Sequence, residues 1–275
     1  MLENRPAPML RVAVAGLGAV GGVLAKRLDE EMIPGLRLTA VSTRDLNKAA
    51  QLVGGFQHYV ALVPVADLVA FADLVVECAP ASALSEVISP FLKVGKSALV
   101  LSVGGLLQRP ELSALANEHG GHILVPSGAV LGIDAVLAAA EGKIRSVKLI
   151  TRKSPQGLAG APHLINQNIS VEGLTAPFCV FSGNALEAVR GFPANVNVVA
   201  SLALAGIGAE RTQVEIWADP SLTKNIHSIQ VDSDAAKFSM EIENIPSENP
   251  KTSRIVVQSV LALLRKLNAP MRIGS

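Results

Sequence analysis

The chain has few aromatic residues, few cysteines and almost no net charge. Aromatic residues make up 3% of its 275 residues, and its two cysteines, Cys78 and Cys179, show no metal-ligand spacing and are too few for a disulfide framework. Lysine and arginine together number 24 against 23 acidic residues, which leaves a net charge of +1 and no basic stripe for nucleic acid. We therefore expect a protein of a reducing compartment, the cytoplasm, that binds no nucleic acid and no metal.

Long apolar segments are also missing. No apolar run reaches the ~18 residues that a membrane-spanning helix requires, and the first residues lack the basic and then apolar order of a signal peptide. We expect no membrane segment. Nevertheless 49% of the residues are hydrophobic, which suits parallel strands covered by helices, and the length of 275 residues suggests two domains.

A glycine-rich turn follows the first apolar segment. Residues 12–15 are typical of a buried strand, residues 19–29 have helical spacing, and Gly16-x-Gly18-x-x-Gly21 joins them. In a dinucleotide-binding turn the first glycine permits the sharp bend, the second lets the backbone approach a pyrophosphate, and the third lets helix and strand pack closely. The order of strand, glycines and helix predicts a Rossmann unit.

The rest of the chain falls into two patterns. Strands and helices alternate up to Pro126, with strands expected at 36–42, 58–60, 73–78, 97–102 and 121–126 and helices at 45–52, 65–71, 82–89 and 109–118. Beyond Pro126 we expect helices at 133–140, 182–190, 195–206 and 252–267, strands at 144–152, 178–181, 212–217, 226–232 and 237–243, and a long loop at 153–168. The first pattern is typical of a doubly wound parallel α/β sheet, and the second of an α+β domain with a mixed or antiparallel sheet. The expected division is a dinucleotide-binding domain at 1–126, a substrate domain at 127–250, and a closing helix within 251–275 that could return to the first domain.

The end of the second expected strand bears on the cofactor. An NAD-binding unit usually carries Asp or Glu about 20 residues past the glycines, where the carboxylate binds the ribose hydroxyls. Here the strand ends in Ser42, Thr43 and Arg44, and Asp45 comes late. A hydroxyl and a guanidinium suit the 2′-phosphate of NADP, although Ser42 and Asp45 would also serve as helix caps. The pattern favours NADP and leaves NAD open.

Several short motifs beyond the glycine turn carry a resemblance. They are PSGA at 126–129, FPANVNV at 192–198, ADPSLTKNIH at 218–227 and ENPKTS at 248–253. With the glycine turn they occur in the order found in the L-aspartate dehydrogenase family, which this sequence resembles over nearly its whole length. The resemblance implies NAD(P)-dependent oxidative deamination of L-aspartate to iminoaspartate, then oxaloacetate and ammonia, with a link to NAD biosynthesis. It also implies that His227 is the active-site histidine and that Ala129 and Asn195 contact the cofactor.

The expected chemistry requires a proton acceptor and cationic groups. Oxidising an amine by hydride transfer requires a neutral amine, and a histidine, with a pKa near 6.5, can take the proton. We expect His227 in this role, and a His227 sealed in apolar packing would contradict it. The substrate carboxylates need cationic or N–H partners, for which Lys224 and His163 are our first candidates and Arg152 and Lys153 others.

Two other functions stay open on the sequence alone. The chain could be another two-domain NAD(P) oxidoreductase, of the dihydrodipicolinate or homoserine type. It could also be a non-catalytic nucleotide sensor, in which His227 would be dispensable. We expect a homodimer, because two-fold dimers are the commonest oligomers.

Overall fold

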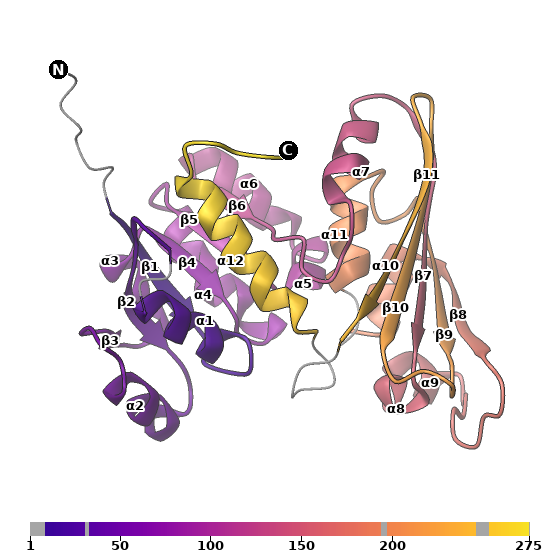
Figure 1. Cartoon of the computed structure of the whole chain (residues 1–275), viewed down its shortest axis with the longest axis horizontal. Coiled ribbons are helices and arrows are strands. Elements are labelled where there is room, and N and C mark those ends of the chain that lie inside the picture. The colour runs from indigo at the N-terminus through magenta and orange to yellow at the C-terminus, as the bar shows by residue number, and fades with distance from the viewer. Residues whose placement is uncertain (1–8, 31–32, 194–196, 246–252, 275) are drawn as a thin grey trace. The chain divides into compact units, whose positions relative to one another are not determined.

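The chain divides into two compact units, each with its own sheet (Figure 1). A computed structural model describes residues 9–30, 33–193, 197–245 and 253–274. The first unit comprises Met1–Gly105, Arg109–Pro126 and Val260–Arg272, and the second comprises Leu106–Gln108, Ser127–Ser259 and Ile273–Ser275. The first unit is therefore built from three separate stretches of sequence.

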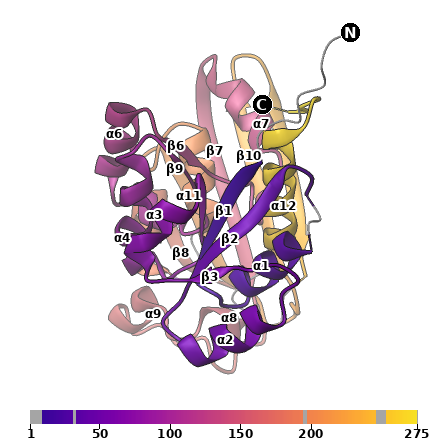
Figure 2. The same cartoon turned by 90° about the vertical axis from the view of Figure 1, so that its left-hand side faces the viewer.

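The first unit contains a six-stranded parallel sheet in the order β3-β2-β1-β4-β5-β6. Figure 2 shows α1 and α12 on one side of it and α3, α4 and α6 on the other. This arrangement confirms the doubly wound Rossmann-type fold. The strands are β1 (Leu10–Ala15), β2 (Leu36–Ser42), β3 (Ala61–Leu62), β4 (Leu74–Glu77), β5 (Ser97–Val100) and β6 (His122–Leu124). The helices are α1 (Gly21–Asp29), α2 (Leu46–Gly54), α3 (Leu68–Phe71), α4 (Leu84–Leu92), α5 (Val103–Leu107), α6 (Pro110–His119) and α12 (Ile255–Asn268), with 3₁₀ turns at Val65–Asp67 and Ala81–Ala83.

The edge strand β3 lies three residues later than the sequence predicted. The strand expected at 58–60 is not formed, because the Asp29 carboxylate at the end of α1 binds the backbone there. It accepts hydrogen bonds from the backbone N–H groups of Gln57 at 2.7 Å and His58 at 3.1 Å. These N–H groups are therefore not available for pairing with β2, and pairing with β2 begins only at Ala61.

The last helix, α12, packs on the first unit from Val260 onward. Val260 and Leu264 lie one helical turn apart and are both fully buried, as an amphipathic helix requires. Near the end of the helix, the Asn268 side-chain amide donates to the Pro34 carbonyl at 2.9 Å. Residues distant in sequence thus complete the first unit.

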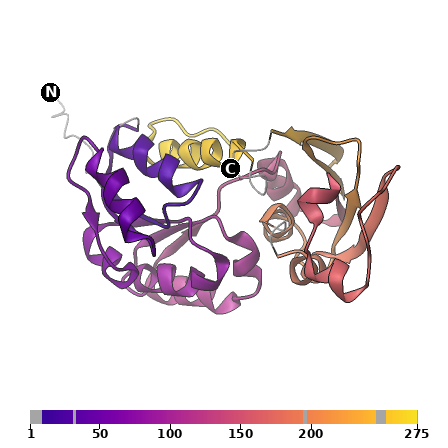
Figure 3. The ribbon, with the colours of Figure 1, turned by 90° about the horizontal axis from the view of Figure 1, so that it is seen from below.

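The second unit contains a five-stranded sheet in the order β11-β10-β7-β9-β8. Strands β7 and β9 are parallel and the other pairs antiparallel, so the sheet is mixed. Figure 3 shows its helices gathered on one face. The strands are β7 (Ile144–Lys153), β8 (Phe178–Asn184), β9 (Thr212–Ala218), β10 (Asn225–Ser233) and β11 (Lys237–Asn244), and the helices α7 (Ile133–Ala140), α8 (Pro155–Leu158), α9 (Pro162–Asn166), α10 (Ala185–Gly191) and α11 (Asn197–Ala205).

Two expectations for the second unit were wrong. Residues 153–168, expected as a loop, contain the short helices α8 and α9, each of which starts at a proline. A proline suits the first turn of a helix because its missing N–H would have no partner there. Helix α10 starts at Ala185 and not at 182, because Asn184 and Glu187 form a capping box in which each side chain accepts from the other's backbone N–H.

Candidate functional site

The glycine turn of the first unit has the geometry of a pyrophosphate cradle. Gly16 has φ +95°, and a Cβ on Gly21 would lie 1.9 Å from the Gly16 carbonyl oxygen. A Cβ on Gly18, in contrast, would meet no protein atom within 4 Å. The open side of Gly18 leaves room for a ligand against the backbone. Helix α1 has no side-chain cap at Val20 and no acidic residue in its first turn, so its N-terminus suits a phosphate.

The end of β2 lies against this turn. The Gly16 N–H donates to the Ser42 carbonyl at 2.7 Å, and Ser42 is buried. Arg44 follows on the surface, and the described strand end from Ser42 to Arg44 carries no carboxylate. The structure thus brings Gly16, Gly18, Gly21 and Ser42 to one place. These residues fit an NAD or NADP molecule.

Glu77 was missed by the sequence analysis. It ends β4 with no solvent exposure, and its carboxylate accepts hydrogen bonds from the backbone N–H of Leu101 at 3.2 Å, the N–H of Ser102 at 2.9 Å and the Ser102 hydroxyl at 3.1 Å. Burial raises the pKa of Glu77. Glu77 therefore fastens the loop after β5 to the carboxyl edge of the sheet, where ligands of this fold bind.

The second unit carries four buried polar side chains at one end of its sheet, which we call the polar end: Thr151, Lys153, His227 and Asn244. His227 on β10 is paired with Thr151 on β7 and with Ile242 on β11. Paired residues of antiparallel strands lie on the same face, and so do residues two apart on one strand. All four side chains therefore lie on the face that the helices cover.

His227 is 3% exposed, and its Nδ1 lies 3.1 Å from the Thr151 hydroxyl oxygen. Burial, and after it the positive charge of Lys153, lower the pKa of His227 to about 3. The imidazole is therefore neutral at physiological pH. In the tautomer whose Nδ1–H donates to Thr151, Nε2 carries the lone pair that can take a proton. Its surroundings include a hydroxyl and an amine, so the packing around it is not purely apolar.

Lys153 is 5% exposed, and among the lysines and arginines whose side chains the structure describes it alone is buried. Burial lowers the pKa of its ammonium group to about 8. At neutral pH Lys153 is therefore a buried cation close to His227.

The other residues expected at the site lie in different places. The Ala129 carbonyl accepts a hydrogen bond from the Asn244 amide at 3.3 Å, so Ala129 joins the polar end. Asn195 lies outside the described residues. Lys224 is exposed and ion-paired with Glu243 at 3.2 Å, while His163 packs against the rings of two phenylalanines, Phe181 and Phe192. Neither Lys224 nor His163 is among the buried side chains of the polar end.

Part of the motif at 218–227 forms a turn that is stabilised by Asp219. Asp219 is buried, and its carboxylate accepts from the Ser221 N–H at 3.0 Å and hydroxyl at 2.6 Å. Its backbone N–H donates to the Lys153 carbonyl at 2.8 Å. The turn connects β9 to β10 and so determines where the strand of His227 begins. An aspartate that binds its own backbone two residues on is a recognisable turn signal.

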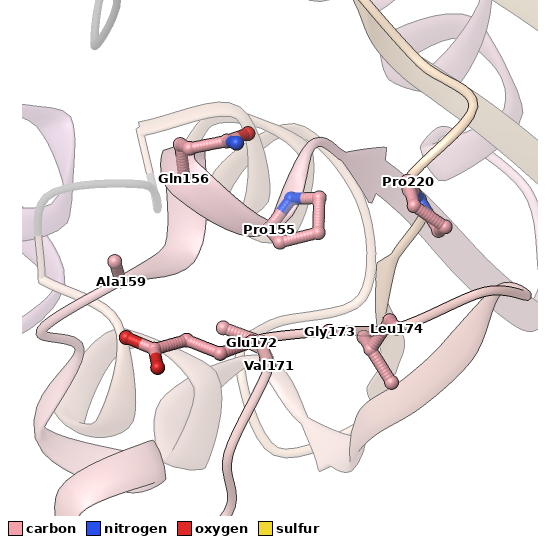
Figure 4. A pocket seen from close by; sticks show the side chains of 8 residues that line it. All are labelled: Pro155, Gln156, Ala159, Val171, Glu172, Gly173, Leu174 and Pro220. Carbon is pink, nitrogen blue, oxygen red and sulfur yellow. The ribbon is translucent and has the colours of Figure 1, made fainter.

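A pocket of about 360 Å³ lies beyond this end of the sheet (Figure 4). Its lining consists of Pro155, Gln156, Ala159, Val171, Glu172, Gly173, Leu174 and Pro220. The single charged group among them is the Glu172 carboxylate, which would repel an anionic substrate. This pocket therefore does not fit a dicarboxylate.

The described residues offer neither a metal site nor a membrane-spanning helix. No group of three or more His, Cys, Asp or Glu side chains in this part of the chain could hold a metal ion. None of the described helices combines the length and apolar character needed to cross a membrane.

Comparison with known proteins identifies relatives of the whole chain. Residues 134–267 match the family model "Aspartate dehydrogenase, C-terminal", and residues 16–126 match "Homoserine dehydrogenase, NAD binding domain". L-aspartate dehydrogenase 3 of Bordetella bronchiseptica is 54% identical over 97% of this chain and 98% of its own length. L-aspartate dehydrogenase of Bradyrhizobium diazoefficiens is 49% identical over 100% of this chain and 98% of its own length.

The fold has a match among solved structures. The crystal structure of aspartate dehydrogenase from Thermotoga maritima aligns with a TM-score of 0.73 at 24% identity, over 96% of this chain and 99% of that one. The sequence relatives at 54% and 49% identity confirm the resemblance drawn from the motifs. The chain belongs to the L-aspartate dehydrogenase family.

Proposed function

We propose that this protein is an NAD(P)-dependent dehydrogenase that oxidises L-aspartate to iminoaspartate, which water converts to oxaloacetate and ammonia. The observation that carries the proposal is a buried, neutral His227 beside the cation Lys153, in the region that matches the aspartate dehydrogenase model. The names of the full-length relatives support the same substrate.

The residues of the polar end account for the proton transfer. When bound, NAD(P) supplies the oxidised nicotinamide ring that accepts hydride from the substrate Cα. His227 takes one proton from the substrate ammonium, so that the amine nitrogen can form the C=N bond as the Cα–H bond breaks. Thr151 holds the imidazole through Nδ1. Two substrate carboxylates would raise the low pKa of His227, because a nearby negative charge stabilises the imidazolium.

The test is the variant His227→Ala. We expect it to bind NAD(P) like the wild type but to lose at least ~100-fold of its aspartate-dependent NAD(P)H formation, the usual range for a general base. A panel of L-amino acids assayed with NAD and NADP, followed by nicotinamide absorbance, defines the substrate. An unchanged rate in His227→Ala would favour the non-catalytic nucleotide sensor.

The cofactor site proposed here consists of Gly16, Gly18, Gly21, Ser42, Arg44, Ala129 and Asn195. Because a guanidinium suits a 2′-phosphate and no acidic group ends β2, we propose that NADP is accepted beside NAD. Replacing Arg44 by alanine is expected to raise the KM for NADP at least ~10-fold and to leave the KM for NAD within about twofold. An equal change in the KM for NADP and for NAD would show that Arg44 does not bind the 2′-phosphate.

The compartment, the oligomeric state and the pathway of the enzyme are proposed as well. We propose a cytoplasmic homodimer that contributes to NAD biosynthesis through iminoaspartate. Sedimentation equilibrium of the purified chain measures the oligomeric state directly, and a monomer at micromolar concentration would contradict the dimer.

A further inference from the structure

The polar end holds two groups that the proton transfer to His227 does not use, Lys153 and Asn244. We propose that Lys153 binds a carboxylate of the substrate and that the Oδ1 atom of Asn244 accepts a hydrogen bond from its amino group. This inference rests on the proposed function, since it assigns the recognition of the amino acid that His227 deprotonates.

Of the two polar atoms of the Asn244 amide, one is hydrogen-bonded and the other is not. The side chain is 2% exposed, and its Nδ2 donates to the Ala129 carbonyl at 3.3 Å. A carbonyl can only accept, so this contact determines which end of the amide is nitrogen. Among the buried side-chain nitrogen and oxygen atoms that the structure describes, Oδ1 of Asn244 alone finds no hydrogen-bond partner.

A buried acceptor without a partner suggests a ligand. Buried polar groups in native proteins are nearly always hydrogen-bonded, and an exception calls for an explanation such as a missing donor. The amino group of an amino acid carries N–H donors in both its charged and its neutral form. It can therefore keep a hydrogen bond to Asn244 before and after its proton has passed to His227.

Lys153 offers the complementary charge. It is the buried cation of the polar end, and its positive charge already acts on His227 and lowers the pKa of that imidazole. A carboxylate bound at Lys153 would offset this charge, so that His227 becomes a better proton acceptor when substrate is present. Binding of the acid group and activation of the base would then be coupled.

The spacing of the strands agrees with a small amino acid. Lys153 lies on β7 and Asn244 on β11, with β10 between them. Asn244 pairs with Asn225 of β10, and Lys153 lies one residue beyond the Arg152–Ile226 pair, so both flank Asn225 in one row across the sheet. Two strand spacings amount to roughly 10 Å. A four-carbon dicarboxylic amino acid with a hydrogen bond at each end spans this distance. His227 lies on the same face, two residues along β10 from this row.

The experiment compares L-aspartate with succinate, which has both carboxylates and no amino group. The variants are Lys153→Met and Asn244→Leu, each saturated with cofactor, and the measurements are kcat and KM for L-aspartate and the inhibition constant of succinate. For Lys153→Met we expect both the KM and the succinate constant to rise at least ~10-fold, as expected for loss of a hydrogen bond to a charged group. For Asn244→Leu we expect the KM to rise at least ~10-fold and the succinate constant to stay within about twofold.

The control is Lys148→Met. Lys148 lies on β7 with its side chain on the opposite face, ion-paired with Glu215 at 2.7 Å, and its replacement should leave both constants unchanged. Thermal unfolding and cofactor binding establish that each variant is folded, and Lys153→Gln replaces Lys153→Met if the latter is not.

Two results would overturn the inference. An unchanged inhibition constant of succinate in the Lys153 variant would show that Lys153 does not bind a carboxylate. A rise of both the KM and the succinate constant in the Asn244 variant would show that Asn244 has only a structural role. Failure of the proposed function itself is seen separately, as a wild-type protein that forms no NAD(P)H from L-aspartate.

Discussion

Two glycines of one turn, three residues apart, have opposite surroundings. Gly21 packs its Cα against the Gly16 carbonyl, so that even a methyl group would clash with the backbone of the first unit. Gly18 faces open space. One glycine is therefore needed for folding and the other only for a ligand.

Alanine at each position separates these roles. We expect Gly18→Ala to keep the wild-type melting temperature and to lose at least ~10-fold in cofactor affinity, because its methyl group occupies the space next to the pyrophosphate. Gly21→Ala should lower the melting temperature as well, because its Cβ would lie 1.9 Å from a carbonyl oxygen. Thermal unfolding and titration with NAD(P) check both, and a destabilised Gly18→Ala would contradict this separation.

The buried charge of Lys153 should lower the stability of the protein. In the unfolded chain the amine keeps its proton up to its ordinary pKa of 10.5, and in the folded protein only up to about 8. Between these pH values the unfolded state binds more protons, so the free energy of unfolding rises with pH. Below pH 8 the full penalty remains, about 3 kcal/mol for a shift of this size.

Removing the amine should recover this free energy. We expect Lys153→Met to raise the free energy of unfolding at pH 7 by up to about 3 kcal/mol, and the difference from wild type to vanish above about pH 10.5. Urea unfolding at pH 7, 9 and 10.5 measures it. A gain that does not depend on pH would point to better apolar packing and not to the charge. Such a variant would be more stable and yet bind the substrate more weakly, the trade-off common at active sites.

At the scale of elements, the start of β10 depends on the turn at 219–221. The Asp219 carboxylate binds the Ser221 N–H and hydroxyl, and the Asp219 N–H binds the end of β7. The turn thus joins the two strands that carry Lys153 and His227. In the register of these strands His227 faces Thr151, and we expect the turn to help hold it.

Loss of this carboxylate should affect both stability and turnover. We expect Asp219→Ala to lower the free energy of unfolding by about 1–3 kcal/mol, because the Ser221 donors lose their acceptor, and to lower kcat by misplacing His227. Ser221→Ala, which removes the hydroxyl and keeps the N–H contact, should have the smaller effect. Urea unfolding and aspartate-dependent kinetics test the pair, and equal stability of Asp219→Ala and wild type would contradict a role for the turn.

At the scale of the whole molecule, the chain completes its first unit with its last helix. Residues Val260–Arg272 belong to the unit that begins the sequence, and Leu264 is fully buried there. Helix α12 therefore links the stability of the first unit to the far end of the chain.

Truncating the buried leucine of α12 should destabilise the first unit. We expect Leu264→Ala to lower the free energy of unfolding by about 2–5 kcal/mol, the range for a buried leucine. Leu263→Ala, on a half-buried position of the same helix, is the matched control and should lose less. Unfolding followed with and without NAD(P) measures the effect, and equal losses in both variants would contradict the packing of α12.

The local patterns of the chain were sufficient for much of the fold. The glycine turn, strand β2 at Leu36–Ser42 and helix α7 at Ile133–Ala140 were predicted at their observed bounds, because each depends on residues close in sequence. The shift of β3 and the start of α10 were missed, because Asp29 and Asn184 act there through specific hydrogen bonds. The periodicity of apolar residues in the sequence does not predict such hydrogen bonds.

By itself the sequence determined the two sheet types and the family, and it singled out His227 as the candidate base, since periodicity, turn residues and short motifs are local properties. Only the tertiary structure decided which side chains join His227. The register between β7, β10 and β11 brings Lys153 and Asn244 to its face, whereas Lys224, three residues from it in sequence, pairs with Glu243. The physical reason is that neighbours in a sheet come from different strands, and their pairing is decided by packing and turns over the whole unit.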